Sequence, residues 1–285
     1  MITAKDVHKS FKNKNVINGI SFTIGKGEIV GLLGPNGVGK TTLIKLLCDI
    51  NKPTAGTITK DDDDTLAVMF DFNGLYNSFN AIDNLSIYLK DDDKEIIEEV
   101  LKKVKLWDDR FRRVDTYSKG MQRKLTIARA LLKKPNVLIL DEPFDGLDIE
   151  SRRYWMDFLM KWKQEGNSLI ITSHIMSDIE ELCDRLIVLK EGKIIVDRRI
   201  SELKQEHSDY VSVRVPNMSE VRPDSVLGGY EYSICSDTEL RIKNISLQKL
   251  QTVIRGLLDA GAVIEEITYD KDSLTKMYLE MMGEI

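Results

Sequence analysis

Residues 34–42, GPNGVGKTT, decide the fold of this 285-residue chain because they match the phosphate-binding pattern GxxxxGK[ST]. An apolar run, Glu28–Leu33, precedes the stretch, and a predicted helix, Thr41–Asp49, follows it. Glycines in such a turn let successive backbone N–H groups face one anion, and the helix start adds the positive end of its dipole. We expect a phosphate chain to be bound by Gly34, Pro35, Asn36, Gly37, Val38, Gly39, Lys40, Thr41 and Thr42.

Lys40 and Thr41 are the residues of this loop whose side chains are expected to contact the phosphates and their metal ion. The Lys40 ammonium is expected to reach the β and γ phosphates, and the Thr41 hydroxyl is expected to ligate Mg²⁺. The alternative is a glycine-rich turn that matches the pattern by chance. The apolar strand before the loop and the helix after it argue against that alternative.

A second apolar run, Asn136–Leu140, ends in two acids, Asp141 and Glu142. Asp141 is placed to hold Mg²⁺ through water, and Glu142 is placed to polarise a water that attacks the γ-phosphate. A strand cap followed by a turn is the alternative interpretation. The accompanying phosphate loop favours the catalytic one.

Other unbroken apolar runs, such as Ser168–Thr172 and Arg185–Leu189, suit strands that are covered on both faces, as in a parallel sheet. Helices are predicted between the runs, including Lys94–Val104, Gly120–Lys133 and Ser151–Glu165. This alternation predicts an α/β fold. Ligands of such a sheet bind beyond the carboxyl ends of its strands.

The alternation of apolar runs and predicted helices ends near Glu202–Asp209. This stretch is polar and charged, which suggests a domain boundary. We therefore predict one domain over 1–205 and a small α+β domain, without a chemical motif, over 206–285. Its expected elements are a strand at Tyr210–Val215, a hairpin at Glu231–Lys243, a helix at Ser246–Ala260, a strand at Val263–Tyr269 and a short helix at Ser273–Met282. One apolar face of the longer helix is predicted to include Leu250, Leu257 and Leu258.

Composition limits the binding partners and the cellular compartment that the sequence allows. The net charge of −5 gives no reason to expect nucleic-acid binding. The three cysteines are scattered and lack a CxxC spacing, which favours a reducing cytosol over a disulfide framework or a zinc site. No run approaches the roughly 20 apolar residues that span a bilayer, so direct membrane insertion is not expected.

With these motifs in place, the chain resembles the ABC ATPase family over about residues 1–205. Tyr117-Ser118-Lys119-Gly120-Met121 is similar to the family's signature, usually LSGGQ, with Ser118 and Gly120 matching. The stretch 144–148, FDGLD, resembles the loop that lies across the family's dimer interface and ends in Asp148. A serine hydroxyl and helix-start N–H groups suit a γ-phosphate, although a plain Ser N-cap is the alternative.

Three further positions take roles from the resemblance alone. His174 resembles the family's switch histidine, whose imidazole can hydrogen-bond the γ-phosphate and the attacking water. A structural histidine is the alternative, and the position of His174 after the apolar run Ser168–Thr172 argues against it. Phe11 fits the aromatic that stacks on adenine, with simple packing as the alternative. Asp71 stands where the family usually has Gln or Glu. Its side chain is one methylene shorter than Glu, so it is expected to contact Mg²⁺ through water or not at all.

The resemblance implies a P-loop NTPase of ABC type, with a mostly parallel core sheet, N-terminal antiparallel strands and a helical subdomain at about 78–135. It also implies an ATPase that uses ATP and Mg²⁺ as half of a head-to-tail pair with a second ATP-binding chain, most simply a homodimer. A separate transmembrane permease would complete a bacterial exporter of drugs, lantibiotics or small toxic peptides. The expected location is cytoplasmic, on the inner face of the cell membrane.

Two other functions remain open from the sequence. A soluble ABC ATPase that acts on nucleic acid or ribosomes is disfavoured by the single set of motifs and the acidic charge. An ATP-dependent regulator that signals through 206–285 is the third possibility. The segment Phe72–Leu89 bears on this choice, because Tyr76, Phe79 and Tyr88 in it either pack the helical subdomain or line a groove for a membrane subunit.

Overall fold

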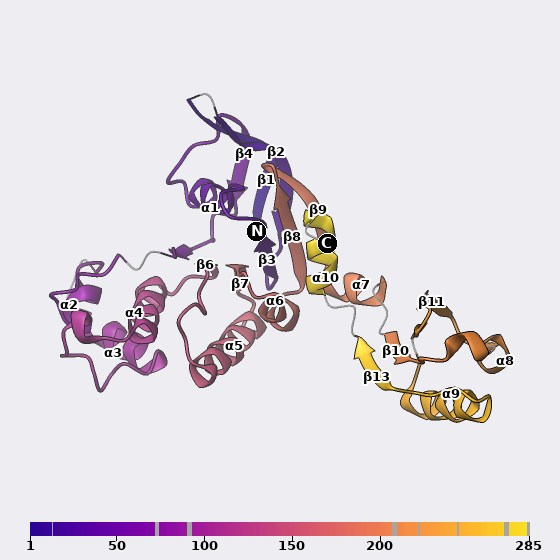
Figure 1. Ribbon diagram of the computed structural model, residues 1–285. Helices are drawn as coiled ribbons and strands as arrows, with labels where there is room; N and C mark the ends of the chain where they lie inside the picture. The colour runs from indigo at the N-terminus through magenta and orange to yellow at the C-terminus, as the bar shows by residue number, and fades with distance from the viewer. Residues whose placement is uncertain are drawn as a thin grey trace. The chain divides into compact units, whose positions relative to one another are not determined.

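The computed structural model describes residues 1–12, 14–71, 74–89, 93–206, 210–221, 223–243, 245–270 and 274–283. Phe72 and Ser273, which the sequence analysis used, lie outside these ranges. The chain divides into two compact units, Met1–Ile200 and Ser201–Ile285, and Figure 1 traces their elements. Each unit has its own apolar core.

A six-stranded sheet forms the centre of the first unit, in the order β5-β6-β7-β3-β8-β9. Its strands are β3 (Ile29–Leu33), β5 (Leu66–Met69), β6 (Val137–Asp141), β7 (Ser168–Thr172), β8 (Arg185–Lys190) and β9 (Lys193–Arg199). Neighbours pair in parallel except β8 with β9, which are antiparallel. Every residue of β3, β6 and β7 is buried, as their unbroken apolar runs predict.

A second sheet in this unit is antiparallel and has the order β2-β1-β4, with β1 (Ile2–Phe11), β2 (Lys14–Ile24) and β4 (Ala55–Lys60). The helix α1 (Lys40–Leu47) contributes Leu43, Ile44 and Leu46 to one apolar core with residues from both sheets. The predicted α/β fold class, with a mostly parallel core sheet and N-terminal antiparallel strands, is confirmed.

Three helices, α2 (Ala81–Ser86), α3 (Lys94–Lys103) and α4 (Lys119–Leu131), pack against one another. Figure 1 shows them grouped together in the chain segment between β5 and β6. Their side-chain caps are Asn80, Asp93 and Ser118, each accepting a hydrogen bond from a backbone N–H in the first turn. The range 78–135, predicted for a helical subdomain, contains all three helices and the turn η1 (Val114–Thr116).

The remaining helices of the first unit are α5 (Ile149–Gln164) and α6 (Met176–Leu182), which follow β6 and β7 along the chain. Both therefore start just beyond the carboxyl ends of buried strands. This edge of the sheet is where the candidate catalytic residues lie.

The second unit has a four-stranded antiparallel sheet in the order β11-β12-β10-β13. Its strands are β10 (Tyr210–Arg214), β11 (Tyr232–Ser236), β12 (Glu239–Lys243) and β13 (Glu266–Asp270). The helical elements along the chain are α7 (Ile200–Glu206), η2 (Met218–Glu220), α8 (Asp224–Leu227), α9 (Leu247–Asp259) and α10 (Leu274–Met282).

The core of this unit lies between α9 and the sheet and includes Val213, Leu240 and Leu257. The predicted apolar face of α9 needs one correction. Leu258 is 52% exposed, whereas Val253 is buried, because the helix turns position 258 away from the sheet. Among the described residues, none of the helices combines the length and apolarity that a bilayer crossing needs.

The three cysteines differ in environment, which predicts a labelling pattern. Burial raises the pKa of Cys48 to about 12 and raises the pKa of Cys183 well above its ordinary value, whereas Cys235 is exposed. Because thiol reagents attack the thiolate, alkylation of the native protein at mildly basic pH should modify Cys235 first. Mass spectrometry of the digested protein measures this. Equal early labelling of Cys183 would contradict the packing described here.

Candidate functional site

The phosphate loop joins β3 to α1, and its backbone conformation depends on glycine. Gly34, Gly37 and Gly39 have φ angles of 151°, 78° and 117°. A Cβ at Gly34 would lie 2.5 Å from the Leu189 carbonyl oxygen, and one at Gly39 would lie 2.9 Å from Ile17 Cδ1. Close packing behind the loop thus excludes larger side chains at Gly34 and Gly39.

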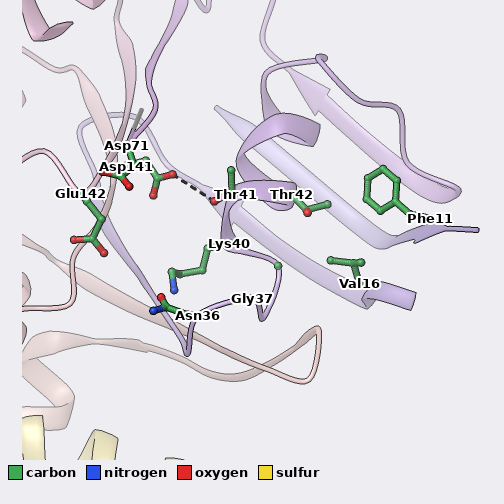
Figure 2. Close-up of a pocket in the computed structure, with 11 residues that line it drawn as sticks. Phe11, Val16, Asn36, Gly37, Lys40, Thr41, Thr42, Asp71, Asp141 and Glu142 are labelled. Atoms are coloured by element: carbon green, nitrogen blue, oxygen red, sulfur yellow. Dashed lines mark hydrogen bonds between the residues drawn. The ribbon is translucent and has the colours of Figure 1, made fainter. Parts of the chain in front are cut away.

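Lys40 lies over this loop as the first residue of α1. Its Nζ donates hydrogen bonds to the carbonyl oxygens of Gly34, at 2.5 Å, and Pro35, at 3.2 Å. Burial lowers the pKa of Lys40, and the nearby carboxylates of Glu142 and Asp141 oppose that shift. The ammonium therefore lies in the same pocket as the two acids, as Figure 2 shows.

Asp141 ends β6 and is 5% exposed. One of its carboxylate oxygens accepts a hydrogen bond from the Thr172 hydroxyl at 2.6 Å, and the other lies 3.5 Å from the Thr41 hydroxyl. The Thr172 hydroxyl also accepts a hydrogen bond from the backbone N–H of Glu142 at 2.9 Å. Thr172, fully buried at the end of β7, thus holds both acids, and the sequence analysis did not assign it a role.

Glu142 has a φ of 51°, a left-handed conformation that is uncommon for a non-glycine residue. Its Oε2 lies 2.9 Å from His174 Nδ1 and accepts a hydrogen bond from the His174 backbone N–H at 3.2 Å. The His174 side chain is 63% exposed and follows β7. The structure therefore brings together the two residues that the sequence analysis put forward as catalytic.

These groups border a pocket of about 350 Å³. Its lining residues are Phe11, Val16, Asn36, Gly37, Gly39, Lys40, Thr41, Thr42, Asp71, Asp141 and Glu142. The Phe11 ring is 45% exposed at the outer end of the pocket, far along it from Glu142 in Figure 2. Val16, on β2, also lines the pocket and was not predicted. Gly34, Pro35 and Val38 belong to the same loop without lining the pocket.

The oxygen atoms of Thr41 and Asp141 suit Mg²⁺, which prefers oxygen ligands and usually takes only one or two from protein. Within the part of the chain that the structure describes, His, Cys, Asp and Glu form no group of three or more that could hold a metal. A site completed by water and phosphate oxygens fits this donor set. Asp71 lines the same pocket, and one of its carboxylate oxygens pairs with Arg123 at 3.0 Å.

Ser118, Gly120 and Asp148 do not line this pocket. The Ser118 hydroxyl caps α4 by accepting a hydrogen bond from the Met121 backbone N–H at 3.2 Å. Asp148 caps α5, and its hydrogen bonds from the Ser151 backbone N–H and hydroxyl hold the pKa of the Asp148 carboxyl below its ordinary value. With respect to their own chain, Ser118 and Asp148 are therefore helix caps, and Gly120 lies in the first turn of α4.

Taken together, a glycine-built loop between β3 and α1, with an acid pair at the carboxyl end of β6, defines a P-loop nucleotide-binding domain. Comparison with known proteins identifies the family within the P-loop nucleotide-binding domains. A family described as "ABC transporter" matches residues 17–145. An uncharacterised ABC transporter ATP-binding protein of Bacillus subtilis (strain 168), YhcH, is 33% identical over 298 residues, which cover 100% of this chain and 96% of that protein.

Two other relatives agree with this assignment, and two solved structures share the fold. The ATP-binding protein NatA of Bacillus subtilis (strain 168) is 36% identical over 68% of this chain and 88% of its own length. A Nod factor export ATP-binding protein I of Burkholderia lata is 37% identical over 69% and 70%. The cassette MJ0796 has a TM-score of 0.65 at 23% identity, over 70% of this chain and 99% of its own. CbiO1 from Clostridium perfringens has a TM-score of 0.64 at 26% identity, over 72% and 90%.

The chain belongs to the ATP-binding proteins of ABC transporters. The ATP-binding domains of this family are ATPases, so the chain is an ATP-hydrolysing enzyme that binds ATP.

The packing behind the phosphate loop predicts the effect of Gly39→Ala. The new methyl group would press on Ile17 and on the Val16 carbonyl oxygen, so we expect nucleotide affinity to fall at least about tenfold. Titration with a fluorescent ATP analogue measures the affinity. Gly166→Ala is the matched control, because Gly166 also has a positive φ, 89°, but nothing lies within 4 Å of its added Cβ. An equal loss of affinity in both variants would exclude a specific role for the loop.

Proposed function

We propose that this chain is the motor subunit of an ABC exporter and acts as one half of a two-fold, head-to-tail pair that encloses two Mg-ATP. The observation that carries the pairing is the position of Ser118 and Gly120, which belong to the predicted signature but lie outside the chain's own nucleotide pocket. In the proposed pair they close over the γ-phosphate held by the partner chain. ATP-binding subunits of this family work in dimers with membrane permeases.

Within one pocket, the proposed roles follow the geometry. The loop N–H groups and Lys40 bind the phosphates, and Phe11 stacks on the adenine. Thr41 and Asp141 would hold Mg²⁺, with Asp71 in contact through water; the ion neutralises charge on the phosphate oxygens when bound. Glu142 orients and polarises the attacking water, and His174 fixes the Glu142 carboxylate and the γ-phosphate.

The exporter assignment rests on relatives. Several proteins that are 36–37% identical over about 70% of this chain are named Nod factor export ATP-binding protein I. By analogy, the proposed cargo is a drug or small peptide, including lantibiotics, that crosses through a separate membrane subunit. The chain would then work on the cytoplasmic side of the cell membrane. A homodimer is the simplest form of the pair.

Replacing the proposed general base tests the mechanism. In Glu142→Gln the amide keeps the shape of the side chain but cannot accept a proton, so hydrolysis should fall about 100-fold or more while ATP binding persists. The variant should then accumulate as an ATP-bound dimer, measured by analytical ultracentrifugation with and without Mg-ATP. Lys40→Ala, which loses the phosphate contact, is the control that should remain monomeric. A monomeric Glu142→Gln at saturating ATP would count against the proposed pair.

The aromatic residues on either side of α2 support a site for the membrane subunit. Tyr76 and Phe79 stack with their ring centroids 5.6 Å apart, and they are 49% and 42% exposed. Tyr88, in the same stretch, is 43% exposed. Exposed aromatic side chains grouped in this way are typical of protein interfaces. We infer that they receive a cytoplasmic helix of the permease.

Tyr76→Ser and Phe79→Ser should therefore release the chain from membranes and leave its ATP affinity unchanged, because neither residue lines the nucleotide pocket. Membrane flotation of cells that express the whole transporter measures the association. Ile50→Ser is the control, since Ile50 is an equally exposed apolar residue at 55% outside this segment. Membrane association that survives both aromatic substitutions would place the contact elsewhere.

A further inference from the structure

The helix α4, which begins at the predicted signature, holds the segment after β5 by two arginines. Arg123 donates hydrogen bonds to the backbone carbonyl oxygen of Asp71, at 3.1 Å, and to its carboxylate, at 3.0 Å. Arg129, further along the helix, donates to the Gly74 carbonyl oxygen at 2.8 Å. The arginines thus bind this segment at Asp71 and again at Gly74.

Arg123 differs from Arg129 in its environment. Arg123 is 8% exposed, so its guanidinium is largely removed from water and needs nearby carboxylates to offset the cost of burying its charge. Two of these are present: Asp71, and Asp145 with an oxygen at 3.8 Å. Both carboxylates are 64% exposed. A buried cation is therefore shared by two acids from different loops.

These loops border the catalytic pocket. Asp71 lines the nucleotide pocket and also a smaller cavity of about 250 Å³ beside Arg123 and Asp145. Asp145 follows Glu142 by three residues and donates its backbone N–H to the Glu142 carbonyl oxygen at 3.3 Å. A displacement of Arg123 would therefore shift both Asp71 and the loop that contains Asp145 and follows Glu142.

A second contact joins α4 to the loop of Asp145 independently of charge. A Cβ on Gly120 would lie 3.2 Å from the Gly146 carbonyl oxygen, so the first turn of α4 rests closely against the loop backbone. The signature turn and the loop after Glu142 are therefore in direct contact within one chain. Arg123 extends this connection to Asp71.

We propose that Arg123 is a positioning residue of ATP hydrolysis, which couples the signature end of α4 to Asp71 and to the loop after Glu142. This inference rests on the proposed function, in which Ser118 meets the partner's ATP and Asp71 faces the chain's own. When Ser118 closes over the partner's ATP, the Arg123 guanidinium would then change the position of Asp71 in the chain's own nucleotide pocket. The hydrogen bond between Arg123 and Asp71 also explains why Asp suits position 71. Because Arg123 orients the carboxylate toward the pocket, the longer side chain of Gln or Glu is not needed there.

A double-mutant cycle on Arg123 and Asp71 tests the coupling. We expect Arg123→Gln and Asp71→Asn each to lower kcat about tenfold through misplacement of the site, with the Kd for Mg-ATP changed less than about twofold. The double variant should be no slower than the slower of the two single variants, because each substitution already breaks the Arg123–Asp71 pair. Asp145→Asn should have a smaller effect, given the longer contact. Unchanged kcat, or losses that multiply in the double variant, would overturn the proposal.

The controls separate this inference from other failures. Arg153→Gln removes another arginine–carboxylate pair, with Glu181 at 2.6 Å, from an exposed side chain and should leave kcat unchanged. If Arg123→Gln lowers the melting temperature strongly, Asp145→Asn decides the question, since its side chain is exposed and, unlike Asp71, has no proposed contact with Mg²⁺. Failure of Glu142→Gln to reduce hydrolysis would refute the proposed function instead, whatever the result of the cycle.

Discussion

The rest of the structure depends on a close approach of backbone to backbone at the start of α1. Gly34 and Gly39 leave no room for a Cβ because the Leu189 carbonyl and the side chain of Ile17 press on the loop from behind. That packing needs β8 on one side and β2 on the other, so both sheets of the first unit must be in place before the loop has its shape. The phosphate cradle is a property of the assembled domain.

The acid pair follows the same logic at the neighbouring strands. Asp141 and Glu142 are adjacent in sequence, and the structure places them at the edge where α1 begins because β6 and β3 run parallel with β7 between them. Parallel strands bring their carboxyl ends to one edge, so residues separated by roughly a hundred positions face one ligand. The position of His174 after β7 follows from this arrangement.

Much of this was accessible from sequence because the signals are local. The phosphate loop, the acid pair and the fully buried strands each occupy a few consecutive residues with a distinct pattern. The strands β5 and β9 were not predicted because their apolar runs, LAVM and IIV, are short and most of their residues are partly buried or exposed. The pairing of Arg123 with Asp71 and the role of Thr172 were also inaccessible, since each joins positions that only the tertiary fold brings together.

The single hydroxyl of Thr172 has a consequence for how this enzyme can change. It donates a hydrogen bond to the carboxylate of Asp141 and accepts one from the backbone N–H of Glu142. One oxygen atom at the end of β7 therefore fixes the position of the Asp141 carboxylate and of the Glu142 backbone. A shift of the Asp141 carboxylate or of the Glu142 backbone would leave a buried polar atom unsatisfied. Evolutionary tuning of turnover is therefore expected to spare this triangle and to act on the exposed residues around it, such as His174.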